Sequence, residues 1–447
     1  MIIPVNDKLN KLANLLPAPL YVVGGYVRNY LIDKTISEDI DLSGDFSTEQ
    51  MIDCLNKCKI EILATYKRTG TVMFKCGTAH CEWTAMRKEV YAQGGNHNPV
   101  EITFSHNIED DAKRRDFKCN AIYYDIKNQK IVDVLGGIKN IEQKVLDTVV
   151  DASEVFCSDG LRLMRLARFV GQLNFTPTSK VLESAKKFSK NILDISVERI
   201  YAELKSILSA DDKYSFSPKD GHYLALKALS ETNVLAHILP ELESGRNMAQ
   251  RQDFHNYDVL EHTLKSVLYA KKEVRLAALL HDIGKPYCYI KNGKFFGHDK
   301  EGCFIAKKIL SRLKVDKETT KNVLFLVENH MKDLDCKMKE NKIRHFIIEN
   351  LKYIESLYLL KQADFMACKD STDICPTIIK WKKIEQKMKE EQVPKTIKEL
   401  KISALDLLER GIVKQNISKE LKKLHYLCVE NPKLNTKEKL LTLIGKQ

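Results

Sequence analysis

The sequence feature that most constrains the fold is a change of hydrophobic periodicity near residue 150. Before this point, short apolar runs such as YVVGG, TVMFKCG, VEITF and CNAIYYD are rich in β-branched and aromatic residues, which is typical of strands. After it, segments such as DGLRLMRLARFVGQLNF repeat apolar residues at three- and four-residue spacing, which indicates helices. The pattern therefore predicts an α+β domain, with a mixed sheet and helices, followed by an all-α body.

A chain of 447 residues is too long for one ordinary hydrophobic core, so we expect several domains. We predict a mixed-sheet head at 1–150, a helical neck at 151–245, a second helical block at 246–379 and a basic helical tail at 380–447. With 44% hydrophobic and 30% charged residues, the composition excludes bulk disorder.

The sequence also bears on where the protein works. No apolar run approaches the roughly 18–20 residues of a membrane span, and the N-terminus lacks the pattern of a signal peptide. The twelve cysteines form no CxxC pair and lack zinc-finger spacing. We therefore expect reduced thiols, a cytoplasmic location and no membrane partner. The sequence leaves the oligomeric state open.

The net charge of +12 is unevenly distributed along the chain. Residues 1–150 carry 19 basic and 20 acidic side chains, whereas 151–379 have an excess of five positive charges and 380–447 an excess of eight. A basic surface of this kind fits a polyanionic partner. The gradient predicts that such a partner is held by the helical body and tail rather than by the head.

Two aspartates occupy alternate positions in the segment SEDIDLSG. Asp39 and Asp41 lie in a run that reads as a strand, so their side chains should point to the same face. Adjacent carboxylates repel unless a cation lies between them, and Mg²⁺ prefers a few carboxylates together with phosphate oxygens. The pair therefore indicates a magnesium site suited to phosphoryl transfer.

A glycine pair, Gly24-Gly25, lies upstream of these aspartates, directly after a strand-like run. Glycine lets backbone N–H groups approach a triphosphate, and Arg28 adds a positive charge nearby. Neither the glycine pair nor the aspartate pair is specific alone. Their combination with an arginine within 22–45 is a much stronger signal for nucleotide chemistry.

The segment 22–45 resembles the GGxVRDxLLG…DxD signature of the tRNA nucleotidyltransferases and bacterial poly(A) polymerases, one branch of the polymerase-β superfamily. Further motifs follow in family order. CEWTAMRKE (81–89) resembles a strand that supplies a third carboxylate, which makes Glu82 the candidate. KRRDFKCNAI (113–122) resembles RRDFTINA, which implies a nucleotide-ordering role for Arg114, Arg115, Asp116 and Asn120.

This chain departs from the family pattern at several positions. Asn29 replaces the usual Asp, and Asp33 stands where Gly is usual. The change at Asn29 removes an expected negative partner for Arg28 or for the turn. Ser158 stands where the family often has Glu.

The segment SDGLRLMRLARF (158–169) resembles the family's neck helix, which chooses the base. Asp159 and Arg162 are three residues apart, which on a helix places them on one face. The carboxylate can accept from an exocyclic amino group and the guanidinium can donate to a ring nitrogen or carbonyl, a pairing that cytosine and adenine offer and guanine and uracil do not. Arg165 and Arg168 continue the stripe and are expected to hold triphosphate or RNA backbone.

The segment RKEVYAQGGNHNPVEI (87–102) lies where these enzymes carry a mobile loop that helps the site switch from cytosine to adenine addition. It contains Arg87, Glu89 and Tyr91, and Asn96-His97-Asn98 replaces the usual Arg before the Pro. Downstream, Arg199 and Glu203 are spaced i, i+4, which predicts a structural ion pair.

A second constellation lies within 255–365, in HNYDVLEHTL, LLHDIGKP, FGHDKEG, ENHM and KQADF. It resembles the HD superfamily of metal-dependent phosphohydrolases, whose pattern is H…HD…D. The resemblance implies a ligand set, the HD cluster, of His262, His281, Asp282 and Asp364, with His298 and His330 as candidates for a second metal; the place of His255 is doubtful. Imidazole with carboxylate suits Ni, Mn, Co, Zn or Fe better than a magnesium cage.

Together these features predict an enzyme that builds or repairs the CCA end of tRNA from CTP and ATP, with Mg²⁺ at the head and a transition metal in the HD cluster. An enzyme that adds only A, or a poly(A) polymerase, would share every head motif. A metal phosphohydrolase with a nucleotide-binding head is the alternative of another class. A non-catalytic RNA-binding protein would not need the carboxylates.

Overall fold

The computed structural model describes residues 1–447 apart from 93, 97, 252, 254 and 445–447. It divides the chain into two compact units. The first comprises Met1–Glu243 with Ser311–Val315, and the second comprises Ser244–Leu310 with Asp316–Gln447. The division into four parts at 150, 245 and 379 stays a prediction.

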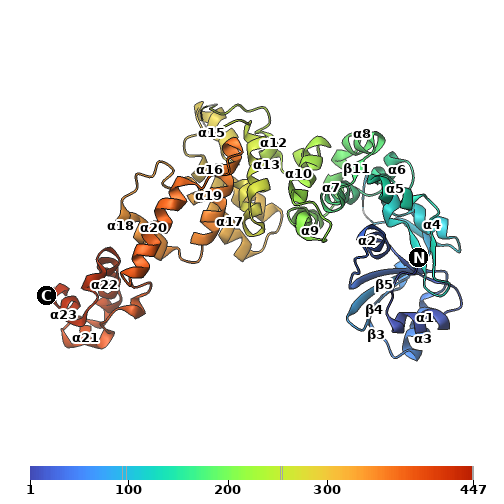
Figure 1. The fold of residues 1–447 in the computed structure, drawn as a ribbon, viewed down its shortest axis with the longest axis horizontal. Coiled ribbons are helices and arrows are strands. Elements are labelled where there is room, and N and C mark those ends of the chain that lie inside the picture. The colour runs from blue at the N-terminus through green and yellow to red at the C-terminus, as the bar shows by residue number, and fades with distance from the viewer. Residues whose placement is uncertain (93, 97, 252, 254, 445–447) are drawn as a thin grey trace. The chain divides into compact units, whose positions relative to one another are not determined.

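The head of the first unit is built on a seven-stranded sheet (Figure 1). The strand order is β3-β4-β5-β2-β1-β8-β9. The strands are β1 (Leu20–Val23), β2 (Asp39–Gly44), β3 (Glu61–Tyr66), β4 (Thr71–Cys76), β5 (Ala79–Ala85), β8 (Tyr123–Asp125) and β9 (Lys130–Val132). Strands β2 and β5 run parallel and the other neighbouring pairs run antiparallel, so the predicted mixed sheet is confirmed.

The two faces of the sheet differ because polar and apolar residues alternate along β2 and β5. Ile40 and Leu42 are buried in a core cluster that also contains Leu12 and Met51. The helices of the head are α1 (Asp7–Leu15), α2 (Gly25–Asp33), α3 (Thr48–Lys57), α4 (Ile108–Lys113) and α5 (Gly137–Gln143). Since α1 and α3 supply Leu12 and Met51, they cover the apolar face and leave the acidic positions of β2 on the other face.

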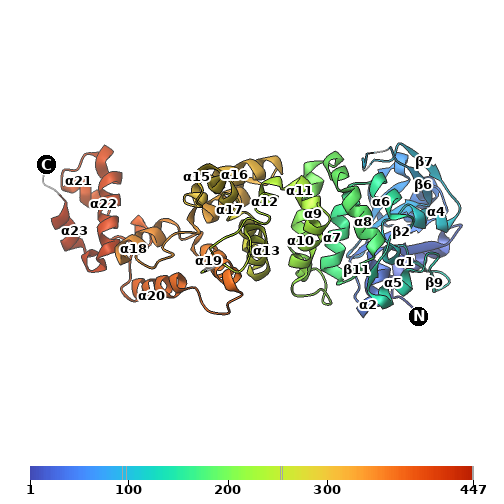
Figure 2. The same cartoon turned by 90° about the horizontal axis from the view of Figure 1, so that it is seen from above.

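A separate two-stranded hairpin lies beside the sheet (Figure 2). It pairs β6 (Arg87–Val90) with β7 (Glu101–Phe104), so the strand expected at VEITF belongs to this hairpin rather than to the large sheet. The loop between them contains residues 93 and 97. The prediction that concerns His97 therefore lies outside the described residues.

The neck is helical, as predicted. Its helices are α6 (Ala152–Ser158), α7 (Leu161–Leu173), α8 (Ser179–Lys187), α9 (Val197–Ile207), α10 (Gly221–Glu231), α11 (Val234–Ile238) and α12 (Pro240–Glu243), with a short parallel bridge of β10 (Val145–Leu146) and β11 (Thr176–Pro177). Helix α7 packs against both α9 and α10 (Figures 1 and 2). A Cβ at Gly171 would lie 2.2 Å from the Gly221 carbonyl oxygen, so glycine permits the close crossing of α7 and α10.

In its described part, the second unit consists of helices and connections. They are α13 (Val259–Tyr269), α14 (Arg275–Leu280), α15 (Lys285–Asn292), α16 (His298–Arg312), α17 (Lys317–Asn329), α18 (Glu340–Glu349), α19 (Ile354–Lys369), α20 (Pro376–Glu390), α21 (Ala404–Glu409), α22 (Ile417–Glu430) and α23 (Lys437–Leu443). Helices α13 and α19 pack against each other. The basic tail has its own small core around Leu407, Leu424 and Leu440, which confirms that it is folded helix.

All twelve cysteines are free thiols in the structure. Among the described helices, none combines the length and apolar character that crossing a membrane requires.

Candidate active site and metal centre

Three carboxylates share the open face of the sheet. Asp41 on β2 and Glu82 on β5 are register partners, and Asp39 precedes Asp41 by two positions on the same face. All three residues are exposed, whereas their strand neighbours Ile40 and Trp83 are buried. The alternation of the two parallel strands thus brings together acidic groups that lie some forty residues apart in the sequence.

The carboxylates of this face disfavour one another's charge. Desolvation by the surrounding protein raises the pKa of Asp41, and the like charge of Asp39 adds to this effect against the pull of nearby arginines. Desolvation, followed by the charge of Asp41, also raises the pKa of Glu82. A divalent cation between such groups relieves the repulsion, so the residues present fit a metal ion held by Asp39 and Asp41.

The turn from β1 into α2 passes directly beside these carboxylates. Val23 pairs with Asp41, and Gly24 follows with a φ of 77°. A Cβ at Gly24 would lie 2.8 Å from an Asp41 carboxylate oxygen, in a backbone conformation that L residues rarely adopt. Gly25 then begins α2, whose first backbone N–H groups have no partner within the helix and can bind an anion.

Arg28 is buried within the first unit. It donates to Asn29 Oδ1 at 2.8 Å, to Asn120 Oδ1 at 2.5 Å and to the Tyr214 hydroxyl at 3.0 Å, and lies 5.2 Å from the Phe169 ring centre. The Asn29 amide oxygen therefore accepts from Arg28, although Asn29 lacks the negative charge of the usual Asp. A direct contact of Arg28 with triphosphate stays a prediction.

A polar cavity of about 440 Å³ lies between the head, the hairpin and the start of α7. It brings together most of the residues that the sequence assigns to the nucleotide. Its lining is Thr69, Arg87, Glu89, Tyr91, Asn98, Pro99, Arg114, Arg115, Asp116, Asn120, Asp159, Leu161, Arg162, Arg165 and Arg199. The abundance of arginine makes it suited to an anionic ligand.

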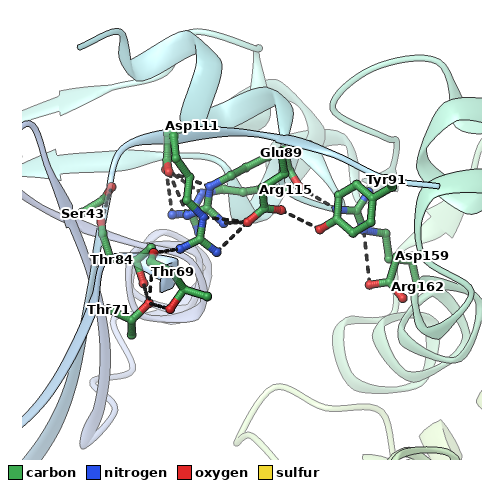
Figure 3. A network of polar contacts seen from close by, with 12 residues as sticks. Ser43, Thr69, Thr71, Thr84, Glu89, Tyr91, Asp111, Arg115, Asp159 and Arg162 are labelled. Atoms are coloured by element: carbon green, nitrogen blue, oxygen red, sulfur yellow. Dashed lines mark hydrogen bonds and ion pairs between the residues drawn. The ribbon is translucent and has the colours of Figure 1, made fainter. Parts of the chain in front are cut away.

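Asp111 organises the two arginines of the RRD motif, a role that the sequence reasoning missed. Its carboxylate lies 2.9 Å from Arg115 (Figure 3) and 2.8 Å from Arg114. It also accepts from the Tyr123 hydroxyl at 2.6 Å. Although burial acts to raise it, these arginines hold the pKa of Asp111 well below its usual range. The i, i+3 and i, i+4 spacing in helix α4 was the signal that could have found it.

Asp116 forms a second buried ion pair between head and neck. Arg165 donates to one of its oxygens at 2.8 and 2.5 Å, and the Asn120 side chain donates to the other at 3.0 Å. Burial acts to raise the pKa of Asp116, but Arg165 holds it well below its usual range. Asp116, Asn120 and Arg165 therefore order the cavity wall, and a direct contact of each with nucleotide stays a prediction.

The prediction that Asp159 and Arg162 lie on one continuous helix is wrong. Helix α6 ends at Ser158, Asp159 has an extended backbone, and α7 begins at Leu161. The Asp159 carboxylate accepts the Leu161 backbone N–H at 2.9 Å, because aspartate caps a helix start better than it continues a helix. Gly160 packs in the break, where a Cβ would lie 2.2 Å from the Asn191 carbonyl oxygen.

The two side chains nevertheless meet at the cavity. Arg162 Nε lies 3.8 Å from Asp159 Oδ2, and the Arg162 guanidinium donates to the Arg114 carbonyl at 2.5 Å and to Ser158 Oγ at 3.1 Å. Burial raises the pKa of Asp159, against the opposing charge of Arg162. The pair is thus a buried carboxylate beside a firmly held guanidinium, with both residues lining the cavity.

The hairpin reaches this pair through Glu89 and Tyr91 (Figure 3). Glu89 accepts from Arg87 at 2.7 Å and from the Tyr91 hydroxyl at 2.5 Å, and lies 3.5 Å from Arg114. The Tyr91 ring centre lies 5.8 Å from the Arg162 guanidinium. Of the hairpin residues named by the sequence, Tyr91 therefore lies against one of the groups expected to choose the base, and Glu89 and Arg87 connect to Tyr91 through hydrogen bonds.

The predicted Arg199–Glu203 ion pair is wrong. Glu203 instead accepts from Arg168 at 2.7 Å, and Arg168 also donates to Gln172. Helix α7 packs against α9, which presents Glu203 to Arg168 and leaves Arg199 exposed at the cavity rim. Arg168 is thus a helix-packing residue here, and its predicted contact with phosphate stays untested.

The HD cluster assembles in the second unit from five segments, namely α13, the end of α14, α16, the end of α17 and α19. His262 on α13 lies 3.3 Å from Asp282 and 3.0 Å from Asp364 on α19, and His281 lies 3.3 Å from Asp282 and 3.5 Å from Asp364. His298 on α16 is 3.2 Å from Asp282, and His330 follows α17 at 3.6 Å. Every sequence-predicted member of this cluster therefore comes together.

The histidines are oriented as metal ligands. His281, His298 and His330 each place Nδ1 within 2.6–2.8 Å of the backbone carbonyl three residues earlier. An N–H at Nδ1 that donates to a carbonyl leaves the Nε2 lone pair facing the cluster, which is the usual arrangement of a metal-bound imidazole.

The electrostatics of the HD cluster also fit a cation. His262 Nε2 and His281 Nε2 are buried, form no hydrogen bond of good geometry with a described group and lie 3.0–3.5 Å from the carboxylates of Asp282 and Asp364. Orphaned polar atoms of this kind cost free energy unless an ion or water satisfies them. The donor set, two to four imidazoles with two carboxylates, suits a divalent transition metal. Asp282 belongs to two possible ligand groups, one with His262 and His281 and the other with His298 and His330.

Three family models match the chain. They are "Poly A polymerase head domain" over 20–147, "Probable RNA and SrmB- binding site of polymerase A" over 174–245 and "HD domain" over 257–410.

Among curated relatives, the A-adding tRNA nucleotidyltransferase of Deinococcus radiodurans is 31% identical over 58% of this chain and 60% of its own. The CCA-adding enzyme of Anoxybacillus flavithermus is 33% identical over 50% of this chain and 52% of its own. That of Bacillus cereus ATCC 10987 is 26% identical over 76% and 79%. The first two matches span about half to three-fifths of the relatives' length.

Solved structures share the fold of the whole described chain. The Bacillus stearothermophilus CCA-adding enzyme in complex with CTP has a TM-score of 0.67 at 20% identity, covering 97% of this chain and 94% of its own. The Thermotoga maritima CCA-adding enzyme complexed with tRNA has a TM-score of 0.62 at 14% identity, covering 98% and 93%. With its head, RNA-binding and HD models in family order, the chain belongs to the family of tRNA nucleotidyltransferases and bacterial poly(A) polymerases.

Proposed function

We propose that this protein adds or repairs the CCA end of tRNA without a template, using CTP and ATP. One observation carries the proposal. The buried Asp159–Arg162 pair opens on an arginine-lined cavity, and two of the arginines of that cavity, Arg115 and Arg165, act on the charge of Asp41. We therefore assign the base-reading pair and the neighbouring metal-binding face to one site.

In the proposed reaction, the RNA 3′-hydroxyl attacks the α-phosphate of the nucleotide and pyrophosphate leaves. Asp39 and Asp41 bind Mg²⁺, with Glu82 as the third carboxylate; the ion supplies charge neutralisation at the phosphates and activation of the hydroxyl. The backbone N–H groups at Gly24 and Gly25 orient the triphosphate.

The choice of base follows from the chemistry of Asp159 and Arg162. The carboxylate accepts from the exocyclic amino group of cytosine or adenine, and the guanidinium donates to the neighbouring ring nitrogen. Uracil and guanine place a carbonyl opposite the carboxylate, which leaves two buried acceptors facing each other. Arg162 is held by the Arg114 carbonyl and Ser158, so the reading edge is ordered before the nucleotide binds.

The basic body and tail hold tRNA through its phosphates. We also place the protein in the cytoplasm. The HD cluster supplies a second proposed activity, hydrolysis of a phosphate or cyclic phosphate at an RNA 3′ end, with Ni, Mn, Co, Zn or Fe as the metal. The unbonded Nε2 atoms of His262 and His281 favour this second activity.

The decisive experiment supplies tRNAs that end before CCA, after C and after CC, with each NTP alone and with CTP plus ATP. Sequencing of the product ends should show C, then C, then A. If no substrate gains C, the CCA proposal fails. If only the CC end gains A, the protein is an A-adding enzyme like the Deinococcus relative. Phosphate release without any nucleotide addition would favour a phosphohydrolase with a nucleotide-binding head.

A further inference from the structure

A second group of metal-ligand side chains adjoins the HD cluster. His255, His262 and Cys368 can each offer one ligand atom such that the three atoms lie within 4.8 Å of one another. Two of these residues, His255 and Cys368, lie outside the H…HD…D pattern. The group combines imidazole and thiol, whereas the HD cluster contains only imidazole and carboxylate.

The group follows from how α13 and α19 pack. Asp364 and Cys368 are four residues apart on α19, so they lie on one face of that helix, and α13 packs against α19. His262 on α13 therefore has a carboxylate beside one edge of its ring and a thiol one helical turn along. The backbone N–H of Asn256 donates to the Cys368 carbonyl at 3.0 Å, which ties the segment of His255 to the same place.

The hydrogen bonding of these histidines points to a missing partner. His262 Nε2 faces Asp364 at 3.0 Å, but His262 Nδ1 is buried and bonds to no described group. His255 Nδ1 is likewise buried and unbonded among the described residues, and its ring centre lies 4.8 Å from that of His262. In contrast, Nδ1 of His281, His298 and His330 each forms a hydrogen bond with a backbone carbonyl.

We propose that Cys368, His255 and His262 Nδ1 bind a soft divalent metal ion such as Zn²⁺, at a site separate from the HD cluster but sharing His262 with it. Thiolate and imidazole together suit Zn²⁺, and a fourth position is left for water. Binding releases the thiol proton to solvent. His262 Nε2 then carries the ring hydrogen and donates a hydrogen bond to Asp364. Because a protonated Nε2 cannot bind the HD metal, the new ion and the HD metal compete for His262.

The ammonium group of Lys285 is engaged outside this site. Lys285 Nζ lies 2.6 Å from Asp282 and donates to Gln250 Oε1 at 2.7 Å. Its charge is therefore directed to the HD cluster, and the thiol is left as the group that neutralises the new ion.

Cobalt titration of the metal-free, full-length protein tests the proposal. Thiolate-bound Co²⁺ gives a sulfur-to-metal charge-transfer band, which the HD cluster cannot give because it contains no thiol. The band should grow to a plateau as Co²⁺ is added, vanish in Cys368→Ser and persist in Cys303→Ser, a matched control on α16 outside every ligand group. It should also persist in Asp282→Asn, which breaks the HD cluster alone.

A second variant guards against misfolding of Cys368→Ser. His255→Ala should keep the band but weaken the apparent Co²⁺ affinity at least about tenfold. A band that survives Cys368→Ser, that disappears equally in Cys303→Ser, or that is lost with Asp282→Asn would overturn a separate thiolate site. So would an unchanged Co²⁺ affinity in His255→Ala.

Discussion

Replacing Asp159 by asparagine tests the proposed reading of the base. The change is nearly isosteric, and the amide oxygen can still accept the Leu161 N–H at the start of α7. What changes is the group that faces the nucleotide, because a charged acceptor becomes an amide whose NH₂ donates. Arg162 keeps its bonds to Arg114 and Ser158, so its position is expected to hold.

The magnitude follows from the hydrogen bond that is lost. A hydrogen bond to a charged group contributes about 1.5–3 kcal/mol, so kcat/KM for CTP and ATP should fall roughly ten- to 150-fold. An amide NH₂ facing the base matches the carbonyl of uracil, so misincorporation of UMP should rise relative to CMP. The Arg162 donors remain, and they still favour the N3 acceptor of cytosine over the N3–H donor of uracil, so CMP should stay the preferred product.

The assay measures single-nucleotide addition to a tRNA that lacks CCA, with CTP, ATP or UTP varied separately. Asp151→Asn is the matched control, because Asp151 caps α6 in the same way but does not line the cavity. Equal losses for CTP, ATP and UTP would refute base reading by Asp159 and indicate a general structural effect. A full effect in Asp151→Asn would refute it as well.

The remaining predictions concern the metal face, its turn, acid stability and salt. Asp39→Asn should abolish nucleotide addition while any HD phosphatase activity remains; loss of both in folded protein would contradict two independent sites. Gly24→Ala should lower addition at least about tenfold and also lower the melting temperature, since the φ of 77° strains an L residue and the new Cβ would lie 2.8 Å from an Asp41 oxygen; wild-type rates would exclude a close turn. The depressed pKa values of Asp111 and Asp116 stabilise the fold above about pH 4, the unfolded value, so the melting temperature should fall as pH drops below it; a flat profile would contradict these ion pairs. Raising salt should weaken tRNA binding steeply but leave the C/A preference unchanged, and parallel changes would refute the separation of tRNA binding from base choice.

The sequence alone predicted much of the fold and of the candidate chemistry. The strand around Asp39 and Asp41 was predictable because alternation along a strand places both carboxylates on one face whatever the tertiary structure. The HD cluster was predicted through its resemblance to the HD superfamily, whose H…HD…D pattern restricts both residue types and order. The change of periodicity near residue 150 distinguished the head from the helical body because the spacing of apolar residues is a local property of strands and helices.

Only the tertiary structure decided which partners the charged side chains take. The i, i+4 spacing predicted that Arg199 binds Glu203, but the crossing of α7 with α9 presents Glu203 to Arg168 instead. Local spacing contributes a few tenths of a kcal/mol, which helix packing readily overrides. Likewise Arg28 binds Asn120 and Tyr214, contacts between residues separated by 92 and 186 positions that no local pattern encodes.

The break at Asp159 shows the same limit at the centre of the site. Its sequence neighbourhood reads as one helix, yet Gly160 packs against Asn191 and the Asp159 side chain caps a new helix. The sequence therefore determined which chemical groups are available for nucleotide and metal. The packing of hairpin, neck and paired helices determined where they meet, because long-range contacts position side chains that local periodicity can only place on a face.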